Sequence, residues 1–128
     1  MKQECEKREL MAIINVDNSI IVIPVGGGSH QIYSSDSSLE AIIKKHLIGR
    51  YSLLDGKFHK LNNLKTILKK GFVLTLGEIN GNYYIEISVK RRKVYFYQYD
   101  KFYGMENVLK DAEDWAGAIV EATINSSL

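Results

Sequence analysis

Strand-like runs are clearest in the second half of the chain. Phe72–Ile79 and Asn82–Val89 flank Asn80-Gly81, a pair that favours the type I′ turn of a two-residue hairpin. Residues 90–93 are polar, and they are predicted to turn the chain into a third strand over residues 94–99. This part of the pattern predicts a three-stranded antiparallel meander.

The N-terminal segment predicts a second group of strands. Two β-branched runs, residues 11–16 and 19–25, are separated by the turn-forming pair Asp17-Asn18. Pro24 near the end of the second run indicates a strand terminus or an edge position. Residues 30–33 predict a third, short strand.

Helical spacing of apolar residues predicts three helices. The longest covers residues 105–124, with most of its acidic residues in the first half, where the helix dipole favours them. Ser37 and Glu40 have the spacing of a capping box ahead of a second helix. A short third helix is expected over residues 63–70, capped by Asn62 and ended by Gly71.

These elements predict a single α+β domain over residues 1–128. An antiparallel sheet, made of the N-terminal strands and the C-terminal meander, is expected to pack against the long C-terminal helix and the two shorter helices. Residues 1–10 are predicted to be a charged tail or a short helix. A chain of 128 residues has the usual size of one domain.

Composition predicts a cytoplasmic protein. The single cysteine, Cys5, forms no intramolecular disulfide, which fits a reducing compartment. The first ten residues are charged and lack the apolar core of a signal peptide. No apolar run approaches the roughly 18 residues of a membrane span, so no membrane association is expected.

Charge is unevenly distributed along the chain. Residues 1–43 carry a net charge of −3, residues 44–93 carry +9, and residues 94–128 carry −4. A basic middle between acidic ends is typical of proteins that bind anions. The alternative is a solvated surface on which the signs interleave after folding.

Catalytic and metal-binding motifs are absent from the sequence. His30, His46 and His59 stand far apart, and Cys5 has no neighbour that would activate it as a nucleophile. We therefore expect no metal and no cofactor, and favour a function other than catalysis. Distant residues can still converge in space, so an enzyme stays an open alternative.

A glycine-rich segment follows the second predicted strand. Gly26, Gly27, Gly28 and Ser29 stand where phosphate-binding loops occur, and their backbone N–H groups would suit an anion. A phosphate loop normally opens directly into a helix, whereas residues 30–33 look extended. A flexible connection is therefore the favoured interpretation.

The strongest binding candidate is one face of the C-terminal meander. If the apolar residues of each strand face the long helix, including Val94 and Phe96, alternation places Tyr84, Tyr95, Tyr97 and Tyr99 on the other face. Exposed tyrosine rings can stack on bases. The adjoining turn adds four positive charges that would contact phosphate: Lys90, Arg91, Arg92 and Lys93. In the alternative, the N-terminal strands cover this face and the tyrosines are structural.

The leading hypothesis is a small non-enzymatic protein that binds nucleic acid or a nucleotide through these tyrosines and the basic turn. The alternative is a protein-interaction module that uses a sheet edge or the acidic helix. Heavy use of Ile, Lys and Asn indicates a low-GC bacterial or phage genome, so the partner in that alternative would be a host protein inhibited by a phage protein. A homodimer formed through a sheet edge would fit either hypothesis.

Overall fold

The computed structural model describes residues 7–24, 29–47, 59–80, 82–100 and 103–126. Within these ranges the chain forms six strands and three helices: β1 (Lys7–Val16), β2 (Ser19–Pro24), β3 (Gln31–Ser34), α1 (Leu39–Leu47), α2 (Asn62–Lys69), β4 (Phe72–Ile79), β5 (Asn82–Val89), β6 (Arg92–Tyr99) and α3 (Met105–Ser126). The predicted α+β class and the long C-terminal helix are confirmed.

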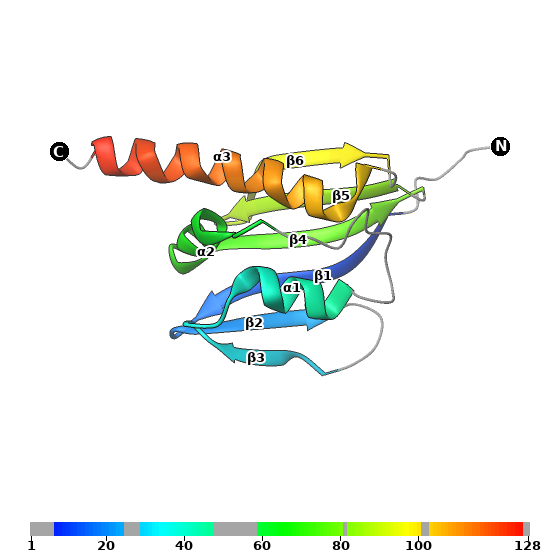
Figure 1. Cartoon of the computed structure of the whole chain (residues 1–128), viewed down its shortest axis with the longest axis horizontal. Coiled ribbons are helices and arrows are strands. Elements are labelled where there is room, and N and C mark those ends of the chain that lie inside the picture. Colours follow the sequence, from blue (N-terminus) through cyan, green and yellow to red (C-terminus); the bar gives the residue numbers. More distant parts are fainter. Residues whose placement is uncertain (1–6, 25–28, 48–58, 81, 101–102, 127–128) are drawn as a thin grey trace.

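All six strands belong to one antiparallel sheet with the order β3-β2-β1-β4-β5-β6. β1 pairs with β4 at the centre, so the N-terminal strands extend the C-terminal meander sideways instead of packing on top of it. Figure 1 shows the three helices on one side of the sheet, here called the helix face. No helix or strand of the described ranges covers the opposite side, here called the open face.

Three two-residue turns connect the strands. The last pairs of the ladders are Val16 with Ser19, Ile79 with Asn82 and Val89 with Arg92. The described turn residues all have left-handed backbone, as the type I′ turn requires: Asp17, Asn18, Asn80, Lys90 and Arg91. The hairpins predicted from Asp17-Asn18 and from Asn80 are confirmed.

One hydrophobic core fills the space between the helix face and the helices. Strand residues such as Ile13, Leu74 and Ile85 are fully buried, and their cross-strand partners are apolar as well. Leu64 of α2 and Leu109 of α3 complete the core from the helix layer. Because most of the apolar area lies on this side, the helix layer and the sheet stabilise each other.

The N-terminus of α1 differs from the predicted capping box. Ser38, not Ser37, caps the helix, because its Oγ accepts a hydrogen bond from the backbone N–H of Ala41 (3.2 Å). The Glu40 carboxylate instead accepts a hydrogen bond from the N–H of Leu61 (3.1 Å). Burial raises the pKa of Glu40, but hydrogen bonds from backbone N–H groups and from Ser38, with the charge of Lys60, outweigh it and hold that pKa below its usual value.

The N-terminus of α2 is capped by another helix. Asn62 was the predicted cap, but Leu61 stands at the cap position and offers no side-chain hydrogen bond. The carboxylate of Glu113 in α3 takes over this role by accepting hydrogen bonds from the N–H groups of Asn63 and Leu64, each 2.9 Å long. A negative charge is favourable there because it faces the positive end of the helix dipole. Glu113 thereby fixes α2 against α3.

Candidate functional site

The β5–β6 turn presents a cluster of exposed positive charges. Lys90 and Arg91 occupy its two central positions with φ of 51° and 65°. Lys90, Arg91, Arg92 and Lys93 are all exposed. Lys93 lies 3.6 Å from the Glu86 carboxylate, and its ammonium stands 4.5 Å from the centre of the Phe96 ring. Within the described ranges no carboxylate forms an ion pair with the other three.

Two further lysines stand at the same end of the sheet. Strand pairing places Phe72, the first residue of β4, opposite Val89, the last residue of β5. Lys69 ends α2, Lys70 follows it, and only Gly71 separates them from β4; both lysines are exposed. Figure 1 shows α2 beside the end of the sheet at which β5 finishes. We name Lys69, Lys70, Lys90, Arg91 and Arg92 the basic end.

Sequence reasoning missed the two lysines of α2, although the signal was present. The Asn80-Gly81 turn sets the register of the β4–β5 hairpin, and this register alone brings the start of β4 next to the end of β5. The lysines that precede β4 could therefore have been assigned to the basic turn. They concentrate at one place part of the +9 charge of residues 44–93.

A surface hollow lies beside the turn. Its volume is about 350 Å³, and its lining includes Val89, Lys90 and Arg92. This volume is at the lower end of the range of small-molecule sites. Two cationic side chains in the lining suit a phosphate-sized anionic group better than a hydrophobic ligand.

A β-bulge in β6 corrects the predicted tyrosine face. The prediction assumed that Val94 and Phe96 face the long helix. A regular hairpin, which would pair Ile87 with Val94, agrees with that assumption. In the structure Ser88 pairs with Lys93 but Ile87 pairs with Tyr95, so β6 holds one extra residue. Because side chains alternate between faces, this extra residue turns the rest of β6 over. The expectation that Tyr84, Tyr95, Tyr97 and Tyr99 share one face is therefore wrong.

Three of the four tyrosines lie on the helix face. Tyr95, Tyr97 and Tyr99 pair with the helix-facing residues of β5, and Tyr95 packs against Trp115 of α3 with ring centres 4.9 Å apart. Tyr99 is 9% exposed, and its hydroxyl donates a hydrogen bond to Met105 Sδ. Burial raises the pKa of both Tyr95 and Tyr99. Tyr97, 52% exposed, offers the most open ring of the three.

The fourth tyrosine, Tyr84, lies on the open face and is fully buried. Its ring stacks on Phe96, with centres 5.4 Å apart and planes inclined by 29°. It also covers Gly77, where any Cβ would overlap the ring atoms of Tyr84. Glycine at position 77 is therefore required by the close approach of the ring. A ligand cannot stack on Tyr84 without displacing this arrangement.

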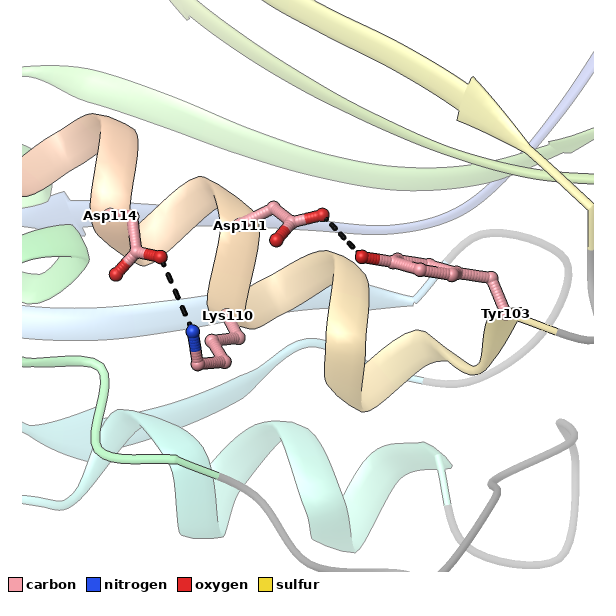
Figure 2. A network of polar contacts seen from close by, with 4 residues as sticks. All are labelled: Tyr103, Lys110, Asp111 and Asp114. Atoms are coloured by element: carbon pink, nitrogen blue, oxygen red, sulfur yellow. Dashed lines mark hydrogen bonds and ion pairs between the residues drawn. The ribbon is translucent and has the colours of Figure 1, made fainter.

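Acidic residues of α3 lie beside the tyrosines of the helix face. Figure 2 shows Tyr103 donating a hydrogen bond to Asp111 (2.7 Å) and Lys110 contacting Asp114 (3.4 Å). The hydrogen bond to Asp111 is the main cause that raises the pKa of Tyr103. The negative charge of Asp111 also raises the pKa of Tyr95, so it lies close to that ring. The same charge would repel a phosphate at this part of the surface. An anion is better placed at the basic end than along the whole of β6.

The remaining predicted positions are only partly described. Gly26, Gly27 and Gly28 lie outside the described residues, and Ser29 and His30 are exposed. His46 forms a hydrogen bond with the Tyr33 hydroxyl (3.0 Å). No group of three or more His, Cys, Asp or Glu side chains in the described ranges is arranged to hold a metal ion. None of the helices within those ranges has the length and hydropathy needed to cross a membrane.

Comparisons with known proteins give no match to a protein family, a curated protein or a solved structure.

Proposed function

We propose that this protein is a non-enzymatic binding protein for an anionic ligand, either nucleic acid or a nucleotide, and that the ligand's phosphates contact the basic end. The observation that carries the proposal is the left-handed backbone of Lys90 and Arg91. Such backbone is routine for Gly and carries a reduced cost for Asn and Asp, but costs other residues about 1–2 kcal/mol each. Positive charge is retained in this turn at the expense of stability, which points to a role for the charge.

Five exposed cations at one end of a sheet suit phosphate chemistry. Arginine presents a planar group that binds two phosphate oxygens at once, and lysine supplies a mobile point charge. Within the described residues only Lys93 of the turn has an ion-pair partner, so the other cations are available to a ligand. The hollow lined by Lys90 and Arg92 would hold one phosphate group.

The tyrosines have a smaller part in this proposal than their number indicates. Tyr84 and Tyr99 are buried, and Tyr95 packs against Trp115. Tyr97 is the exposed ring of β6 on the helix face, which Arg92 also faces because it pairs with Val89. A base that extends from the basic end would stack on Tyr97, which is worth roughly 1–3 kcal/mol.

Fluorescence anisotropy tests the proposal with labelled single-stranded and duplex DNA and RNA of about 20 nucleotides, over about 50–300 mM salt. A panel of nucleotides is tested by displacement. We expect micromolar or tighter binding that weakens with salt. Arg91→Ala/Arg92→Ala is expected to weaken it at least tenfold and to reduce the salt slope by about 2, because about 0.7–0.9 is lost per phosphate contact.

The matched control is Lys44→Ala/Lys45→Ala, which removes the same charge from α1, a helix in front of β1 and β2 (Figure 1). It is expected to change the affinity less than threefold. Equal losses in the two variants would show that net charge, not the turn, drives binding. No binding to any probe would overturn the proposal in favour of a module that binds a host protein.

A further inference from the structure

The open face of the sheet is unusually apolar on its N-terminal side. Six outward-facing positions of β3, β2, β1 and β4 carry valine or isoleucine: Ile14, Val16, Ile21, Ile23, Ile32 and Val73. Ile32 is 67% exposed and Val16 is 44% exposed. We name these six residues the aliphatic patch.

The strand sequences indicate that this face is covered in the functional protein. An antiparallel strand with one solvated face alternates apolar and polar residues, whereas a strand buried on both faces is apolar throughout. In β2 the run Ile20-Ile21-Val22-Ile23 has no alternation. Ile20 and Val22 are buried in the core, whereas Ile21 and Ile23 lie on the open face. Half of this apolar run therefore lies outside the core between the sheet and the helices.

We propose that the open face is the interface of a homodimer, in which a second copy of the chain packs its own open face against the first. Two sheets that stack in this way lie about 10 Å apart and interdigitate their facing side chains. A two-fold axis that crosses the strands between the two sheets brings each strand over its own copy. The aliphatic patch of one copy then covers that of the other.

Charge on this face fits a second copy. Glu86 and Lys93 are the charged residues of the open face whose side chains are described, and they pair with each other at 3.6 Å. The face has no net charge from these residues, so two copies meet without like-charge repulsion. The strongly basic turn stands at the end of the sheet, outside the patch.

The size of the face is slightly below that of a standard specific interface. Six strands about 4.8 Å apart, with about eight residues at about 3.3 Å each, give a flat footprint of about 700 Å². Standard specific interfaces bury about 800 Å² per partner. The patch alone covers about a quarter of the footprint, so a weak dimer with a dissociation constant in the micromolar range is expected.

Sedimentation equilibrium of the full chain, over about 1–500 μM, tests this dimer. The wild-type mass is expected to rise from 14.6 kDa toward twice that value as concentration increases. Val16→Glu/Ile32→Glu buries charge in the interface and is expected to raise the dissociation constant at least tenfold. The matched control is Tyr97→Glu, a similarly exposed residue on the helix face, and it is expected to dimerise like the wild type.

A second measurement on the wild type decides the matter if the double variant fails to fold. In methyl-labelled protein, dilution is expected to shift the signals of Ile14, Ile21 and Ile32, and to leave the core residues Ile67 and Ile85 unchanged. A mass of 14.6 kDa at every concentration would overturn the proposal, as would a folded double variant that dimerises like the wild type. Dilution shifts absent from the three open-face isoleucines would also overturn it.

Discussion

Two turns of this sheet have the same backbone and opposite chemistry. Asp17 and Asn18, between β1 and β2, have φ of 51° and 65°, and Lys90 and Arg91, between β5 and β6, have the same two values. Aspartate and asparagine tolerate left-handed backbone, since their short polar side chains bond locally, but lysine and arginine gain nothing from it. The residues of the first turn therefore suit the backbone of the hairpin. Those of the second turn carry a conformational cost and expose positive charge.

A turn residue can be required by the backbone of the hairpin or by a function of its side chain, and the two turns differ in which requirement their residues meet. A turn selected for folding has residues like those of the β1–β2 turn, and the β4–β5 turn with Asn80 follows the same rule. The β5–β6 turn departs from the rule, and it does so with exposed cations grouped near Lys69 and Lys70. The departure supports the proposed binding surface more strongly than the number of tyrosines does.

The largest expected change in stability comes from a residue distant from both turns. Glu113→Ala leaves two N–H groups of α2 without their acceptor, so the free energy of unfolding is expected to fall by about 2 kcal/mol. Urea denaturation measures this loss. Anion binding by the folded variant should be unchanged, which shows that lost stability alone does not remove binding.

The control for this variant is Glu121→Ala, an exposed acidic residue of the same helix. Its effect on stability should stay within about 0.5 kcal/mol. If Glu113→Ala also weakened anion binding, binding would depend on the packing of the helices. The residues of the β5–β6 turn alone would then not explain it.

The reverse exchange of turn residues has the next largest effect. Asp17→Lys/Asn18→Arg gives the β1–β2 turn the residues of the β5–β6 turn, and we expect the free energy of unfolding to fall by about 1–2 kcal/mol. Urea denaturation against the wild type measures the difference. An unchanged stability would mean that this backbone accepts lysine and arginine without cost.

The smallest effect concerns pH. Because the pKa of Glu40 is lower in the folded protein than in the unfolded chain, its contribution to stability is present above the unfolded pKa, near 4.5, and is lost as pH falls through the folded value. Thermal melts of wild type and Glu40→Gln between pH 7 and about pH 3 should differ less at the acid end. Glu40 is not part of the basic end, so binding by folded protein should not follow this loss.

Local patterns were sufficient to predict most elements of the fold. β4 and β5 have the predicted bounds, since Asn80-Gly81 fixes a two-residue hairpin, and α3 begins at the predicted Met105 because its apolar spacing is sustained over several turns. The basic turn was also identified, since four consecutive cations are visible in any sequence. The proposed role of that turn remains a prediction.

Features that depend on contacts between distant segments were not predictable from one sequence. The bulge that turns Tyr95, Tyr97 and Tyr99 to the helix face leaves no mark in the residues around Val94, because it is stabilised by packing such as Tyr95 against Trp115. Glu113 caps a helix that begins about fifty residues earlier, so no capping pattern near Asn62 could reveal it. The pairing of β1 with β4 likewise depends on contacts between distant segments.

The proposal that the charge of the β5–β6 turn binds the ligand is tested most directly by giving this turn the residues of the β1–β2 turn. Lys90→Asp/Arg91→Asn has a pair that already occupies this backbone in the same protein. We expect the free energy of unfolding to rise by about 1–2 kcal/mol and the affinity for labelled nucleic acid to fall more than tenfold. A more stable protein that has lost binding would show that the charge, not the fold, is the purpose of this turn. Unchanged affinity in a folded variant would contradict the account.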